Sequence, residues 1–450
     1  MPTNSSFLKA EISAESLKKL VLSRSGKEPK KGKARKRAAT TVVGLDIQPG
    51  YVSAVQARVN GSVVVQRAVG AALPPDTVRE GEVIDAQALS ETLRELFAGA
   101  KLDRRVRIGV ANQRTVLRTL EMPPIPEGKE LATAVRFQAE DQIPMPLSSA
   151  VLDYQTLGIV DTPLGPRQQV VVVAAQKDMV EKLLAAVRAA GLRPEGIDLS
   201  AFALIRSLHR DDDRHQGRVL YLNVGGLTNM AIAEGTTCRF TRVAAGGLEA
   251  MASVVAERNG IPLTNARDLL AAVDLSAPAD VGAAAPAAAT AIATAAATDA
   301  SPAAAVLPVG GGANDVATPF IAPTLVQPPL AEAPPAEVTT PPLAAAEPSA
   351  PREPEIDVRP VLVAGVREIA GEVRNSLDFH RSQEGGGEVS TVVLSGAALQ
   401  IAGFADALSA ELNVAVITQT VDLGEGVARG IVAPERLAVA AGLAVEEIPR

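Results

Sequence analysis

Two apolar strands of this chain end in polar turns whose residue types suit the binding of phosphate groups. The first strand ends at Asp46, and the second ends at Asn223 and runs on through Gly225, Gly226 and Thr228. Glycine-containing turns at strand ends can direct backbone N–H groups at phosphate oxygens, and a carboxylate beside them can hold a hydrated divalent ion. The two turns therefore predict a phosphate site shared by two parts of the chain.

Each turn opens a β-meander, and the two meanders have the same plan. Their further strands are predicted at 51–55 and 62–65 around an Asn60-Gly61 turn, and at 229–233 and 237–240 around a Glu234-Gly235 turn. Short strands joined by such turns are typical of hairpins. A meander that occurs twice predicts a duplicated α/β fold with two lobes and a cleft between them.

Strands and helices alternate through residues 41–275, and the pattern resumes over 356–450. Apolar spacing predicts a helix over 83–97 and a second over 177–190, which Gly191 ends as a C-terminal cap signal. Alternation of this kind is typical of α/β domains. We expect the second lobe to begin before residue 275 and to be completed after 356.

Composition excludes several classes of function. The net charge of −7, the 2% aromatic content and the absence of Trp argue against a nucleic-acid binder. The one cysteine, Cys238, excludes an intrachain disulfide and fits a reducing compartment. His209, His215 and His380 lack a metal-ligand spacing with each other or with that cysteine. We expect no metal site made of protein side chains alone.

The first 40 residues form a basic leader. A run between Lys27 and Arg37 contains seven Lys or Arg residues and only Glu28 as an opposing charge. Such runs are usually solvated and flexible; the alternative is peripheral contact with an anionic membrane. No stretch approaches the ~20 apolar residues that span a bilayer, and no secretory signal is present. We therefore expect a cytoplasmic protein.

Residues 276–355 differ from the rest of the chain. They contain 27 Ala and 15 Pro among 80 residues, with Arg352 as the single basic residue. Frequent proline prevents long helices, and alanine side chains are too small to build a core. The composition predicts a disordered insert within the second lobe.

Five segments resemble PilM, the actin-like component of type IV pilus assembly and a relative of the division protein FtsA. They are Val43–Ile47, Glu121–Ile125 continuing to Gln138–Pro144, Leu152–Gln155, Asp198–Leu204 and Glu368–Phe379. The segment Ala139-Glu140-Asp141-Gln142-Ile143-Pro144 is the most family-specific part. The resemblance covers about 41–275 and 356–450, without the leader or the insert.

The resemblance implies a two-lobed actin-like (ribonuclease H-like) fold with a small extra subdomain at about 115–175. It implies a cleft that binds ATP with Mg²⁺, with Asp46, Asn223, Gly225, Gly226, Thr228 and Gly396 as candidate cofactor-binding residues. It further implies a cytoplasmic scaffold that binds the cytoplasmic tail of a PilN-like inner-membrane protein and other proteins of the pilus or a related secretion platform. Self-association is a further expectation.

Several positions depart from the family pattern around the cleft. Gln48 stands where the family has glycine, and Pro49 removes a backbone donor. Asn223 replaces an aspartate, Ser200 replaces a glutamate, and Ala397 follows Gly396 in place of a second glycine. We expect no active ATPase, with nucleotide bound weakly or no longer at all. An active ATP-binding switch and an FtsA-like division protein are the alternatives.

Overall fold

The computed structural model describes residues 42–163, 165–277, 356–383, 386–425, 427 and 432–446, together with the strand pairing of residues 11–12. The remainder of the predicted leader and nearly all of the alanine- and proline-rich segment lie outside the described residues.

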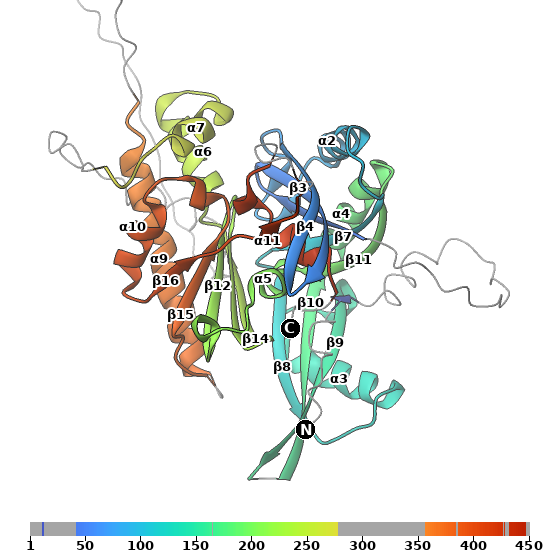
Figure 1. Ribbon diagram of the computed structural model, residues 1–450. Coiled ribbons are helices and arrows are strands. Elements are labelled where there is room, and N and C mark those ends of the chain that lie inside the picture. The colour runs from blue at the N-terminus through green and yellow to red at the C-terminus, as the bar shows by residue number, and fades with distance from the viewer. Residues whose placement is uncertain are drawn as a thin grey trace, which may run out of the picture. The chain divides into compact units, whose positions relative to one another are not determined.

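The first lobe is built on a seven-stranded sheet (Figure 1). Its order is β1 (Glu11–Ile12), β11 (Arg193–Leu199), β7 (Arg105–Val110), β2 (Val43–Gln48), β3 (Tyr51–Asn60), β4 (Ser62–Ala72) and β17 (Asp422–Leu423). Helices α2 (Ala86–Ala98) and α4 (Lys177–Ala189) pack on one face, and α5 (Ser200–Leu208) and α11 (Ala438–Leu443) on the other. Alternate residues of β2 face opposite ways: Val43 and Leu45 enter the core with α2 and α4, and Gly44 lies against α11.

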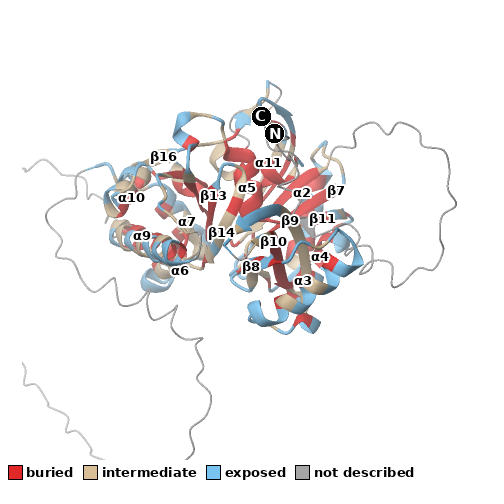
Figure 2. Cartoon of the chain, turned by 90° about the horizontal axis from the view of Figure 1, so that it is seen from below, coloured by how far each residue is buried: buried red, intermediate tan, exposed pale blue. Residues whose placement is uncertain are grey.

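The second lobe is built on a five-stranded sheet. Its order is β14 (Thr237–Ala244), β13 (Thr228–Glu234), β12 (Arg218–Val224), β15 (Thr391–Ser395) and β16 (Val416–Thr418). The helices that accompany it are α6 (Leu248–Asn259), α7 (Leu263–Ala271), α9 (Arg359–Ser382) and α10 (Phe404–Leu412). The central strands β12, β13 and β15 are largely buried, whereas β14 and β16 at the two edges are mostly half-buried. Figure 2 shows exposed residues on the helices.

A third body consists of a three-stranded antiparallel sheet and one helix. Its strands are β8 (Thr115–Met122), β10 (Gly165–Gln176) and β9 (Ala150–Thr162), in that order, with α3 (Lys129–Gln142) packed on them. Leu131, Val135 and Ala139 of α3 share a small core with Val170 and Val172 of β10. The smaller elements are β5 (Val78–Arg79), β6 (Glu82–Val83) and four short 3₁₀ turns, Leu147–Ser149, Asp213–His215, Ala397–Gln400 and Pro434–Arg436.

Helix α2 begins later than the apolar spacing predicts. Val83 belongs to β6, and the side chain of Asp85 accepts hydrogen bonds from the N–H groups of Gln87 and Ala88. An aspartate in that position caps a helix, so the chain leaves the hairpin at Ile84 and turns into the helix at Ala86.

Two helices connect the lobes at close range. Helix α5 contacts strands of both sheets, and α11 packs on α5 and on β2. A β-carbon on Gly442 of α11 would lie 1.9 Å from the carbonyl oxygen of Ala203, so this contact requires glycine. Arg206 of α5 is buried, pairs with Asp198 and donates from Nε to the Gly442 carbonyl at 2.9 Å. Arg206 therefore ties α5 to both β11 and α11.

Candidate functional site

The predicted phosphate turns lie next to one another at the junction of the two lobes. Strands β12 and β15 run parallel with Asn223 opposite Ser395. Asn223 near the end of β12 and Gly396 directly after β15 therefore lie at the same end of the sheet. Gly396 has a φ of 103°, and a β-carbon there would lie 2.4 Å from the carbonyl oxygen of Val224. The turn after β2 contacts the turn after β12 through Gln48 and Pro49.

The side chain of Gln48 bridges the two turns. Its Nε2 donates to Oδ2 of Asp46 at 2.6 Å, and its Oε1 accepts from the backbone N–H of Gly226 at 3.2 Å. A backbone N–H of the second turn and a carboxylate of the first are the groups that a phosphate and its metal ion would engage. Here one amide side chain satisfies both.

The backbones of the turns are also in close contact. A β-carbon on Gly225 would lie 2.2 Å from Oε1 of Gln48, and one on Gly226 would lie 2.2 Å from the carbonyl oxygen of Pro49. A methyl group on Gly226 would therefore clash with the Pro49 backbone, whereas one on Gly225 would meet the end of the Gln48 side chain. In this arrangement the turns bind each other.

Asp46 has an environment that disfavours its charge. It is 4% exposed, and burial raises its pKa to about 7, although the hydrogen bond from Gln48 acts in the opposite direction. A carboxyl group that is partly protonated at neutral pH is a weaker partner for a divalent ion than a full carboxylate. Burial therefore reduces the negative charge that Asp46 carries at neutral pH.

The remaining predicted residues are engaged within the second lobe. Nδ2 of Asn223 donates to Oγ of Ser395 at 3.1 Å, and the hydroxyl of Thr228 donates to the carbonyl oxygen of Gly246. Ser200 is 2% exposed, and its hydroxyl has no hydrogen-bond partner among the described residues. Among the same residues there is no group of three His, Cys, Asp or Glu side chains that could hold a metal ion.

Two further side-chain pairs close the junction around Gly50 and Tyr51. Arg267 of α7 pairs with Glu249 of α6, Nε to Oε2 at 2.9 Å, and its Nη1 reaches the carbonyl oxygen of Leu73 in the first lobe at 3.2 Å. Arg436 lies over the ring of Tyr51, with Cζ 4.5 Å from the ring centroid. Sequence reasoning missed these residues, because no local pattern joins positions so far apart.

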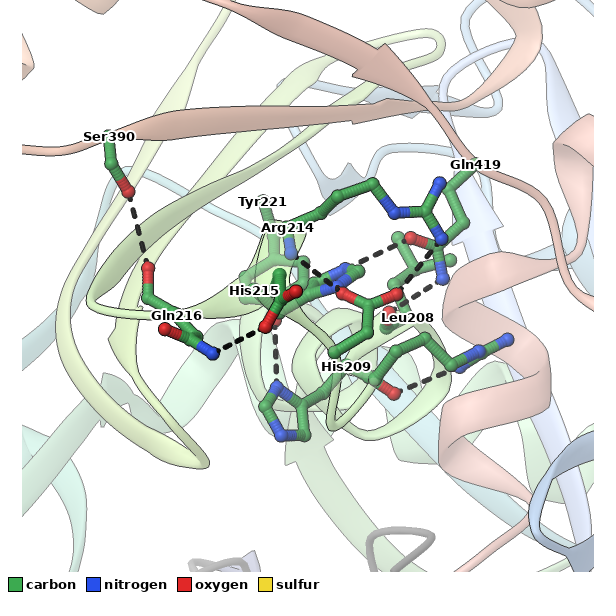
Figure 3. A network of polar contacts seen from close by, with 11 residues as sticks. Leu208, His209, Arg214, His215, Gln216, Tyr221, Ser390 and Gln419 are labelled. Carbon is green, nitrogen blue, oxygen red and sulfur yellow. Dashed lines mark hydrogen bonds and ion pairs between the residues drawn. The ribbon is translucent and has the colours of Figure 1, made fainter.

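A separate polar network ties the two segments that pass between the lobes (Figure 3). His215 is buried; its Nδ1 lies 2.6 Å from Oδ1 of Asp212, and its Nε2 lies 3.1 Å from Oε1 of Gln419. Nε2 of Gln419 donates to the carbonyl oxygen of Leu208 at 2.6 Å, so its oxygen faces the histidine. Both ring nitrogens of His215 therefore lie within hydrogen-bond distance of a side-chain oxygen. The bond to His215 also holds the pKa of Asp212 well below its usual range.

Residues 44–278 match the family described as "Type IV pilus assembly protein PilM". Among solved structures, the "PilM-PilN type IV pilus biogenesis complex" is 23% identical with a TM-score of 0.59, covering 90% of this chain and 98% of that one. The ethanolamine utilization protein EutJ from Carboxydothermus hydrogenoformans is 14% identical with a TM-score of 0.43, covering 91% of each chain. MreB 5 of Spiroplasma citri bound to AMPPNP is 10% identical with a TM-score of 0.42, covering 90% of this chain and 95% of that one.

The first of these likenesses, with the paired sheets described above, confirms the predicted two-lobed actin-like fold with a small extra subdomain. No described helix is both long enough and apolar enough to cross a membrane.

Proposed function

The chain belongs to the PilM family of type IV pilus assembly proteins, and from this premise we propose that it is a cytoplasmic scaffold which binds the cytoplasmic tail of a PilN-like inner-membrane protein. The solved relative is named as a complex of PilM with PilN, which gives the class of partner. We expect the tail to bind near the small subdomain formed by β8, β9, β10 and α3. That body leaves Phe137 74% exposed and Ile159 61% exposed, which supports a role in docking.

We further propose that the nucleotide site of this scaffold has become a structural contact. The observation that carries this proposal is the Gln48 bridge, which uses both the Asp46 carboxyl and the Gly226 N–H that a nucleotide would need. The contact of Pro49 with Gly226 supports it. ATP with Mg²⁺ then has no free binding surface between the turns, and partner binding proceeds without it.

The other expected associations follow from the same role. A platform scaffold would contact additional assembly proteins and would associate with copies of itself. The basic leader within residues 1–40 would add attraction to an anionic membrane surface next to the partner's membrane segment.

A binding experiment tests the partner and the nucleotide separately. The purified full chain is titrated with the cytoplasmic tail peptide of the PilN-like protein from the same cell, with and without Mg-ATP. We expect saturable binding whose affinity is the same in both conditions. Absent binding would contradict the scaffold role, and binding that requires Mg-ATP would instead identify an active nucleotide switch.

Liposome sedimentation with the full chain and with a chain lacking residues 1–40 tests the membrane contact. Membrane binding that depends on the leader and needs no partner tail would favour the FtsA-like alternative.

A further inference from the structure

A cavity of about 400 Å³ lies between the lobes and is separate from the Gln48 bridge. One wall comes from the end of β7 and the segment that joins it to β8, including Asn112, and from Leu199 and Ala201 on either side of Ser200. The other wall comes from β13, from β14 with the two residues after it, and from α9. It approaches the second phosphate turn only through Asn229 and Gly246. A volume of this size is within the range of small-ligand pockets.

The polar lining of the cavity includes acceptors that have no hydrogen-bond partner among the described residues. Glu368 is half-buried and has neither a hydrogen bond nor an ion pair among the described residues; burial and the nearby charge of Glu372 raise its pKa. Asn229 is 5% exposed, and its Oδ1 has no hydrogen-bond partner in the described part of the chain. The cation in the lining, Arg242, is already paired with Glu372 at 2.6 Å. Unpartnered acceptors of this kind cost stability unless a ligand satisfies them.

The wall formed by β14 adds backbone acceptors. In the described sheet this strand lies at the edge and pairs with β13 alone, and its last four residues, Thr241–Ala244, line the cavity. Gly246 also lines it, but its carbonyl oxygen already accepts from Thr228. An edge strand presents unpaired C=O and N–H groups on its free side. The cavity therefore combines a carboxylate, an amide oxygen and a free strand edge.

A ligand for this lining must supply several N–H donors and positive charge. A phosphate group would face Glu368 and Glu372 and be repelled. A guanidinium group is planar, always charged and carries five N–H donors, and it loses less hydration on burial than an ammonium group. We propose that the cavity binds a guanidinium group, with Glu368 as its charged partner and Asn229 and the edge of β14 as further acceptors. This inference is independent of the proposed scaffold role.

The guanidinium group could belong to a free small molecule or to an arginine side chain of an extended peptide. Calorimetry on the full chain separates these sources, with agmatine as the small molecule and a capped Gly-Ser-Arg-Ser-Gly peptide as the extended segment. Tighter binding of the peptide identifies an arginine-bearing partner, and equal or tighter binding of agmatine identifies a small guanidine.

The neutral isostere of arginine is the control that needs no mutation. The same peptide with citrulline keeps the shape and loses the charge, and we expect it to bind at least about tenfold more weakly. Equal affinity of the two peptides, or no binding of either peptide or of agmatine, overturns the proposal.

Substitution of the charged partner provides the second test. We expect Glu368→Gln to weaken binding of the better guanidinium ligand about tenfold or more. Glu257→Gln on the exposed side of α6 is the matched control and should leave binding unchanged. An unchanged affinity in the Glu368 variant, with its fold verified by circular dichroism, also overturns the proposal.

Discussion

The two polar regions at the junction of the lobes differ in how far the protein satisfies its own groups. At the phosphate turns, Gln48 pairs the Asp46 carboxyl with the Gly226 N–H, and the backbones touch. In the neighbouring cavity, Glu368 and Asn229 retain unpartnered acceptors. A site whose polar groups bind each other contributes to stability, whereas a site that leaves them unpaired retains a capacity to bind. The comparison predicts that substitutions in the first region change stability and that those in the second change binding.

The largest effect is expected where the turn backbones meet. Gly226→Ala places a methyl group against the Pro49 carbonyl and should lower the free energy of unfolding by about 2 kcal/mol or more. Urea denaturation measures it. Gly371→Ala is the control, because nothing lies within 4 Å of the added carbon on α9, and alanine favours a helix. Equal stability of the Gly226 variant and the wild type would mean that the turns do not touch in solution.

The bridge itself is the next test. Gln48→Ala leaves the Asp46 carboxyl and the Gly226 N–H without their shared partner and should cost about 1 to 3 kcal/mol in unfolding free energy. Gln87→Ala on the exposed face of α2 is a matched control and should stay within about 0.5 kcal/mol of wild type. If both variants have the same free energy of unfolding in urea, the Gln48 side chain does not bridge the turns, and the difference between the two regions disappears.

Asp46 gives the first region a pH dependence. The pKa of Asp46 is raised from 3.8 to about 7, so the folded state holds a proton that the unfolded state releases. The protonated carboxyl group therefore contributes fully to the free energy of unfolding below pH 4, and this contribution is lost as the pH rises to 7. Asp46→Asn removes that loss. We expect the difference in free energy of unfolding between the variant and the wild type to rise by about 1 to 3 kcal/mol in favour of the variant from pH 5 to pH 8, as measured by urea denaturation at each pH. A stability difference that is the same at pH 5 and at pH 8 would contradict a raised pKa of Asp46.

The smallest effect is expected in the cavity. Glu368→Gln removes a carboxylate that has no partner among the described residues, so the unfolding free energy should change by no more than about 0.5 kcal/mol. Thermal or urea denaturation at pH 7 measures it beside Gln48→Ala. A loss as large as that of the Gln48 variant would place Glu368 in a structural contact and erase the difference between the two regions.

The sequence allows the fold to be predicted because its signals are local and repeated. Alternating apolar residues and turn glycines predict both meanders, although β3 extends to Asn60 where the pattern predicted an end at Val55. The extra length comes from pairing with β4, which local pattern does not contain.

Less of the site could be predicted. The residues Asp46, Asn223 and Gly396 were identified by type, but whether they bind a nucleotide stays a prediction. Gln48 stood out only as a departure from the family, and the direction of its amide depends on a turn 178 residues away. The Glu249–Arg267 pair and the lining of the cavity likewise depend on tertiary contacts that no local spacing encodes.

Calorimetric titration of the folded full chain with Mg-ATP tests the central claim most directly, with Asp46→Ala as the control. We expect no saturable heat from the wild type or the variant, because the turns already bind each other. Micromolar binding by the wild type that Asp46→Ala abolishes would contradict it and would mean that nucleotide separates the turns and occupies the cleft.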